Sequence, residues 1–148
     1  GCLVDAYCGI GTISLPLAAA GFDLVGVELN PDSIEQARSN ARMNGLHDRC
    51  RFVAGDVADH LRQALAGCDG LMLDPPRRGL DDRVIEAILG SPPPLLAYLS
   101  CDAATQARDL RRLVGPSGCY RLERLQPIDF FPQTSHLESL ALLKRISS

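Results

Sequence analysis

The sequence predicts an α/β fold with a doubly wound, mostly parallel sheet of seven strands. Two observations lead to this class. Short apolar runs alternate with helical patterns along most of the chain, which is typical of βα units that build a parallel sheet. The last two apolar runs have no helical pattern between them, so we expect an antiparallel strand at the C-terminal end of the sheet.

Each strand is predicted from a short run rich in aliphatic residues. The predicted strands span residues 2–6, 24–27, 51–54, 70–73, 95–100, 119–126 and 137–145. The predicted helices span residues 12–20, 31–44, 57–65, 81–89 and 103–114. Local signals support several helix ends, because Pro31 suits a first helical position, Gly21 and Gly45 suit the residue after a helix, and Asp56 suits a cap.

Length and composition indicate one soluble globular domain over residues 1–148. The chain is 46 % hydrophobic and 22 % charged, and it contains neither a bilayer-spanning apolar run nor a signal peptide. Because the strand pattern begins almost at Gly1, we expect the C-terminal part of a longer protein. The six cysteines show no metal-ligand spacing, so we expect no metal, reduced thiols and a cytoplasmic location.

The net charge of −3 argues against a protein that grips nucleic acid by itself, because such proteins usually carry a clear basic excess. It remains compatible with a catalytic domain that leaves the binding of a nucleic acid to other parts of a molecule.

Cys101 is the strongest candidate for a catalytic residue. It directly follows the predicted strand 95–100 and precedes the predicted helix 103–114. Open α/β sheets bind ligands at the carboxyl ends of their strands, and a helix amino terminus stabilises a negative charge on a nearby sulfur. The sequence therefore predicts a nucleophilic thiol at this edge of the sheet.

Three segments at the ends of the first three strands predict a nucleoside-binding edge. Gly9 and Gly11 allow the backbone to approach a ligand closely before a helix begins. Glu28 can accept hydrogen bonds from two ribose hydroxyls, and Asp56 can meet an adenine amino group. Glu28 would otherwise be a solvated strand end, whereas Asp56 is expected to cap a helix in either case.

Two further segments supply polar groups at the same edge. In Asp74-Pro75-Pro76-Arg77-Arg78-Gly79, the two prolines stiffen the loop and hold the Asp74 carboxylate at the rim. Arg77 or Arg78 can pair with a phosphate, while at least one of them is expected to be an ordinary surface charge. Glu138 opens the last predicted strand and can act as a base, and His136 is expected to shape the preceding loop.

These motifs together resemble the S-adenosylmethionine-dependent RNA (uracil-5-)-methyltransferases over essentially the whole chain. They are Asp-x-Tyr-Cys-Gly-x-Gly-Thr, Gly-Val-Glu, Asp-Pro-Pro-Arg-x-Gly, Tyr-x-Ser-Cys-Asp and Phe-Pro-x-Thr-x-His-x-Glu. The resemblance implies a Rossmann-like class I methyltransferase fold and RNA as the substrate, held mainly by domains outside this chain. The ribosomal-RNA branch, acting on 23S ribosomal RNA, is favoured over the transfer-RNA branch.

The resemblance also implies roles for individual residues. Cys101 would add to C6 of a flipped-out uridine, and Glu138 would remove the proton from C5. Tyr7, Gly9 and Glu28 would hold S-adenosylmethionine, and Asp74 would contact the target base or support the cofactor site. The family usually has proline where this chain has Ala103, so we expect a looser start of that helix with intact chemistry.

Two alternatives stay open. Exocyclic-amine methyltransferases also use an Asp/Asn-Pro-Pro loop, although theirs normally ends in an aromatic residue and Arg77 stands in that place here. A catalytically inactive cofactor-binding module would keep the nucleoside-binding edge without using Cys101.

Overall fold

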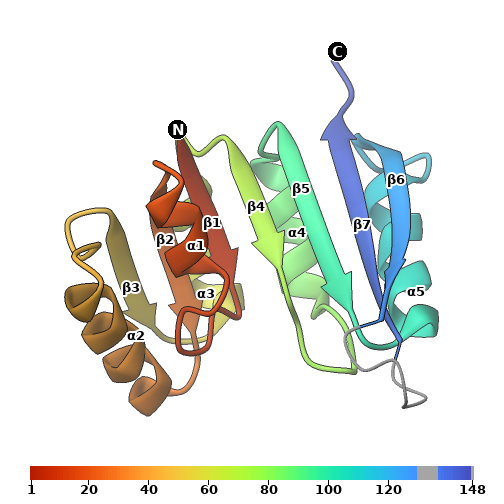
Figure 1. Cartoon of the computed structure of the whole chain (residues 1–148). Helices are drawn as coiled ribbons and strands as arrows, with labels where there is room; N and C mark the ends of the chain where they lie inside the picture. The colour runs from red at the N-terminus through yellow and green to blue at the C-terminus, as the bar shows by residue number, and fades with distance from the viewer. Residues whose placement is uncertain (130–136, 148) are drawn as a thin grey trace.

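One seven-stranded sheet runs through the whole molecule in the order β3-β2-β1-β4-β5-β7-β6 (Figure 1). The computed structural model describes residues 1–129 and 137–147. Its strands are β1 (Cys2–Ala6), β2 (Asp23–Glu28), β3 (Cys50–Ala54), β4 (Gly70–Leu73), β5 (Leu95–Ser100), β6 (Tyr120–Ile128) and β7 (Glu138–Arg145). Its helices are α1 (Ser14–Ala19), α2 (Pro31–Met43), α3 (Val57–Leu65), α4 (Asp82–Gly90) and α5 (Ala103–Val114).

The first five strands are mutually parallel, and β7 is antiparallel to both of its neighbours. This confirms the predicted fold class with its antiparallel strand at the C-terminal end of the chain. The strand order reverses between β1 and β4, which places the expected ligand crevice at their carboxyl ends. Strand β7 lies inside the sheet between β5 and β6, and β6 forms the edge.

Helices cover both faces of the sheet, as the predicted double winding requires. Helices α3, α4 and α5 pack on one face through a core that includes Leu61, Ile88 and Leu113. Helices α1 and α2 lie on the other face, where Ile34 and Ala37 of α2 are fully buried. In residues 1–129 and 137–147 no helix combines the length and the apolar character needed to cross a lipid bilayer.

The ends of the elements agree closely with the local signals in the sequence. Gly21 and Gly45 both adopt positive φ after their helices, and Pro31 is the first residue of α2. The prediction that a helix begins at residue 12 was wrong, because residues 12 and 13 form a turn before Ser14. Residue 81 is likewise the cap of α4 and not its first helical residue.

Helix α5 starts at Ala103 as predicted, although the family that the motifs resemble usually has proline at this position. The Asp102 carboxylate accepts hydrogen bonds of 3.0 Å from the backbone N–H groups of Ala104 and Thr105. These bonds supply a side-chain cap at the helix start that directly follows Cys101.

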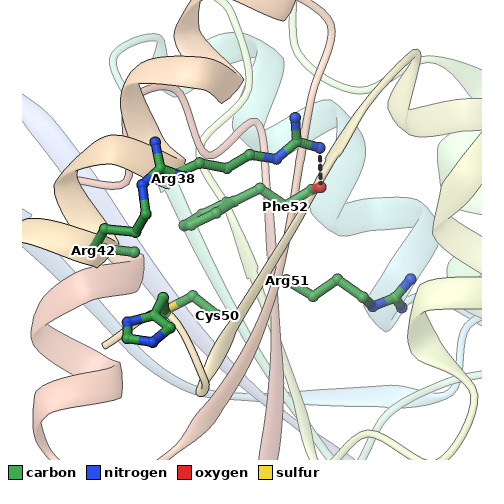
Figure 2. Close-up of a pocket in the computed structure, with 7 residues that line it drawn as sticks. Arg38, Arg42, Cys50, Arg51 and Phe52 are labelled. Atoms are coloured by element: carbon green, nitrogen blue, oxygen red, sulfur yellow. Dashed lines mark hydrogen bonds between the residues drawn. The ribbon is translucent and has the colours of Figure 1, made fainter. Parts of the chain in front are cut away.

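Strand β3 forms the other edge of the sheet, and a hollow of about 440 Å³ lies beside it. Figure 2 shows Arg38 and Arg42 of α2 beside this hollow, with Arg51 pointing away from them. Arg38 Nη2 donates a hydrogen bond of 3.0 Å to the carbonyl of Phe52, which satisfies this backbone acceptor on an edge strand. No residue predicted for the functional site lines this hollow.

Candidate active site

One face of the central strands changes from apolar to polar at the carboxyl ends of β1, β4 and β5. The alternate residues Val4, Leu71 and Tyr98 are buried in the core under α3, α4 and α5. Their neighbours in sequence therefore point to the opposite face, since successive side chains of a strand alternate. That face carries an apolar hollow of about 500 Å³ whose lining includes Met72 and Ala97.

The same alternation, followed along each strand, places four reactive side chains on this face. They are Asp5 near the end of β1, Asp74 just after β4, Cys101 just after β5 and Glu138 at the start of β7. The strand register places Asp5 level with Met72 and Ala97, so Asp74 lies two residues and Cys101 four residues further toward the carboxyl ends of the strands. The sheet thus places Asp74, Glu138 and the Cys101 thiol near the predicted ligand edge, with Asp5 deeper in β1.

Cys101 and Glu138 come together through the antiparallel pairing of β5 with β7. Ser100 and Ser139 are the last register partners of the two strands, and Cys101 and Glu138 are the residues that directly adjoin this pair. Cys101 is exposed, whereas the other five cysteines are buried or partly buried. The predicted nucleophile is therefore accessible, and both it and the predicted base adjoin the last register pair of β5 and β7.

Two of the carboxyl groups on this face have raised pKa values. Burial raises the pKa of Asp74, and the negative charge of Glu138 raises it further. Burial raises the pKa of Asp5 to about 6; the hydrogen bond from Ser14 opposes this shift and the charge of Asp74 adds to it. Asp74 thus lies within electrostatic reach of both Asp5 and Glu138.

Asp5 is a site residue that sequence reasoning did not single out. Its carboxyl is 1 % exposed, and its Oδ2 accepts a hydrogen bond of 2.6 Å from Ser14 Oγ of α1. Its Oδ1 is buried and accepts no hydrogen bond from any residue in 1–129 or 137–147. A carboxylate inside an otherwise apolar strand was the available signal, because buried polar groups usually have partners.

Replacing Asp5 by asparagine is expected to stabilise the protein at neutral pH. Because the pKa of Asp5 is raised from 3.8 to about 6 in the folded state, its stability contribution is full below pH 4 and is lost as pH rises through 6. Asparagine keeps an acceptor for Ser14 and cannot ionise. We expect a gain of about 1–3 kcal/mol in the free energy of unfolding at pH 7.

Urea unfolding of the wild type and of Asp5→Asn between pH 4 and pH 7 measures this effect. The difference between the two proteins should grow over this range. The same difference in the free energy of unfolding at pH 4, 5, 6 and 7 would contradict the titration assigned to Asp5. Asp69→Asn is a suitable comparison, since Asp69 lies at the opposite end of the sheet beside Cys2.

The loop after β1 carries the glycines of the predicted nucleoside-binding edge and contacts Glu28. Gly9 adopts φ +56°, and a Cβ built there would meet no atom within 4 Å, so this backbone faces open space. Gly9 N–H donates to Glu28 Oε1 at 3.2 Å, and Asn30 N–H donates to Oε2 at 2.8 Å. Each carboxylate oxygen of Glu28 keeps further acceptor capacity for a ligand.

Tyr7 and Gly11 shape the same loop. Tyr7 adopts φ +64°, and it is the one non-glycine residue with positive φ in the described part of the chain. Such conformations concentrate at functional sites. The Tyr7 side chain packs against the core beneath α3 and α4, and burial raises its pKa to about 12. Gly11 adopts φ +92°, which a residue with a side chain rarely tolerates.

Asp56 caps α3, as predicted, through a hydrogen bond of 3.0 Å from the N–H of Ala58. Its other oxygen lies 3.4 Å from Arg83 Nη2 of α4. Arg77 and Arg78 are exposed on the loop after β4, and Thr105 and Arg108 bind their backbone carbonyls. His136 lies outside the described residues.

The strand order and the double winding are those of the Rossmann-like class I methyltransferase fold. The model of the tRNA (uracil-5-)-methyltransferase family matches residues 1–146, and the chain belongs to this family. A tRNA (uracil-54, C5)-methyltransferase of Pyrococcus abyssi, solved with S-adenosyl-L-homocysteine, superposes with a TM-score of 0.83 at 33 % identity; the match covers 95 % of this chain and 33 % of that chain.

Curated relatives carry related names. An uncharacterized RNA methyltransferase of Parasynechococcus marenigrum is 70 % identical over all of this chain, which covers 32 % of that protein. Another from Gloeobacter violaceus is 52 % identical over 97 % of this chain and 30 % of its own length. The chain thus spans about a third of the relatives that it matches.

Proposed function

We propose that the protein transfers a methyl group from S-adenosylmethionine to C5 of a uridine in RNA, through a covalent adduct between Cys101 and C6. The observation that carries this proposal is that Cys101 and Glu138 directly adjoin Ser100 and Ser139, the last register pair of β5 and β7. Uracil C5 is a weak nucleophile and needs activation by addition at C6. A thiol and a base on facing strands supply the two groups that this chemistry requires.

The residues of the β1 and β2 loops fit S-adenosylmethionine. Gly9 leaves room for a ligand against its backbone, and Glu28 keeps acceptor capacity for ribose hydroxyls. In our proposal, Tyr7, Gly9, Gly11, Glu28 and Asp56 bind the cofactor, with Asp74 supporting it. When bound, S-adenosylmethionine supplies an electrophilic methyl group on a sulfonium.

The chain's own residues perform the remaining steps. The Cys101 thiolate adds to C6 of the flipped-out uracil, which gives C5 the character of an enolate. C5 is the atom that accepts the methyl group. Glu138 then takes the proton from C5, and the bond between C6 and sulfur breaks to release the thiolate. Asp74 contacts the target base, and Arg77 lies exposed where a phosphate of the RNA can reach it.

The motifs favour 23S ribosomal RNA as the substrate, while the likeness to the Pyrococcus abyssi enzyme favours a transfer RNA. Both substrates use the same chemistry at the same edge. The protein is proposed to act in the cytoplasm, with RNA held mainly by parts of the longer protein outside this chain.

RNA that contains 5-fluorouridine tests the mechanism. Fluorine replaces the proton that Glu138 removes, so the full-length protein with S-adenosylmethionine should form an adduct that survives denaturation. Ordinary RNA should gain 5-methyluridine. When the protein methylates RNA isolated from cells that lack the gene, the position of the new 5-methyluridine in 23S RNA or in a transfer RNA identifies the substrate. Methyl groups on an exocyclic amine, or binding of S-adenosylhomocysteine without methylation of any RNA, would contradict the proposal.

A further inference from the structure

One face of α5 holds the loop that follows β4. Thr105 Oγ1 donates to the carbonyl of Arg77 at 3.0 Å, and Arg108 Nη2 donates to the carbonyl of Arg78 at 2.9 Å. Asp109 Oδ2 accepts the N–H of Leu80 at 2.9 Å. Residues three and four positions apart share one face of a helix, so these side chains act on the loop from the same side.

Asp109 joins this loop to the strand that carries Cys101. It is 1 % exposed, and the same Oδ2 accepts a hydrogen bond of 2.7 Å from Tyr98 Oη of β5. Its Oδ1 accepts from Arg108 Nε and Nη2 at 3.2 and 3.1 Å. Asp109 therefore binds the loop, strand β5 and Arg108 at once, and a buried carboxylate needs such partners.

The loop backbone lies so close to α5 that only glycine fits at its centre. A Cβ built on Gly79 would lie 2.7 Å from Arg108 Nη2 and 2.7 Å from Asp109 Oδ2. Gly79 also adopts φ +83°, which favours glycine. Its N–H donates to the carbonyl of Pro76 at 2.9 Å, so a hydrogen-bonded turn spans Pro76 to Gly79.

We propose that Thr105, Arg108 and Asp109 are positioning residues for the methyl-transfer reaction, which act by holding the Asp74 loop at a set place beside Cys101. This inference rests on the proposed function. Asp74 leaves β4 at one end of the loop, and Cys101 immediately precedes the cap of α5. If α5 releases the loop, the thiol and the base-contacting carboxylate lose their mutual geometry. A displacement of about 1 Å in such a geometry can lower a rate about 100-fold.

Arg108→Met and Thr105→Val test the proposal in the full-length protein, since both side chains are exposed or partly exposed and neither change removes the bonds of Asp109 Oδ2 to Leu80 and Tyr98. With saturating 5-fluorouridine RNA and S-adenosylmethionine, we expect the rate constant of adduct formation to fall about 10–100-fold. Thr105→Ser keeps the hydroxyl and should restore most of that rate. The affinity for S-adenosylhomocysteine should fall by a smaller factor than the adduct rate, because Gly9 and Glu28 are unchanged and only the support from Asp74 is weakened.

Arg112→Met is the matched control. Arg112 lies on the same helix, pairs with Asp82 of α4 and is similarly exposed (41 % against 54 % for Arg108). It makes no contact with the loop among its hydrogen bonds, so its rate should equal that of the wild type. A merely structural defect would lower the fraction of protein that reacts and leave the rate constant of the remainder unchanged.

Amide hydrogen exchange at Leu80 gives a readout that needs no substrate, and exchange should be faster in Arg108→Met than in Arg112→Met. Wild-type rates in both loop variants would overturn the positioning role alone. A wild-type protein that forms no adduct and methylates no RNA would overturn the proposed function, and the positioning role with it. Faster exchange together with slower adduct formation supports the proposal.

Discussion

Replacing Cys101 by alanine is expected to lower methyl transfer by about 10⁵-fold or more and to abolish the covalent RNA adduct. Alanine removes the atom that bonds to C6, and among residues 1–129 and 137–147 no second exposed thiol can replace it. The neighbouring side chains Asp74 and Glu138 are carboxylates, and the other five cysteines are buried or partly buried. The loss should therefore affect the chemical step and not the binding of RNA or cofactor.

Rates of 5-methyluridine formation and gel shifts with 5-fluorouridine RNA measure this effect in the full-length protein. Cys119→Ala is the control, because Cys119 is partly buried at the opposite end of the sheet and its N–H pairs with the carbonyl of Leu113. Normal turnover by Cys101→Ala would show that the thiol is not the nucleophile.

Most of the fold could be predicted because its signals are local. Pro31, Gly21 and Gly45 mark helix ends through backbone geometry that each residue favours by itself. The position of β7 between β5 and β6 could not be predicted in this way. Strands β6 and β7 pair with each other whether β6 or β7 lies next to β5. Which of the two lies inside the sheet depends on which one buries its side chains. Leu143 of β7 is buried in the core, whereas Leu125 of β6 is 53 % exposed.

The site shows the same division between local and distant effects. Cys101 and Glu138 were candidates because of their places at strand ends, yet what brings these two chain segments together is the register of β5 with β7, whose last pair is Ser100 with Ser139. Asp109 was not predicted as a site residue. A single carboxylate on the apolar face of a predicted helix does not reveal from the sequence which groups it will bind. Its partners, Leu80 and Tyr98, lie 29 and 11 residues away in sequence and meet it only in the folded chain.

Replacing Glu138 by glutamine is expected to slow turnover by about 10²–10⁴-fold while leaving the first covalent step intact. Glutamine has nearly the same shape and cannot accept the C5 proton. Cys101 should still add to C6, but the methylated adduct has no base to release it. We therefore expect the adduct to accumulate with ordinary uridine RNA, which the wild type resolves quickly. This outcome separates Glu138 from Cys101, whose replacement prevents the adduct altogether.

Denaturing gels with ordinary RNA, followed over time, measure the accumulation. Glu123→Gln is the matched control: Glu123 lies on edge strand β6, where it pairs with Arg121, and it should behave as the wild type. The charge of Glu138 raises the pKa of Asp74, so the same substitution should also lower the pKa of that carboxyl toward its ordinary value. A variant that turns over normally, or one that forms no adduct, would remove Glu138 from the proposed proton transfer. Adduct accumulation together with the fall in the Asp74 pKa would place the base and the thiol in one site, because both effects require Glu138 to face that edge of the sheet.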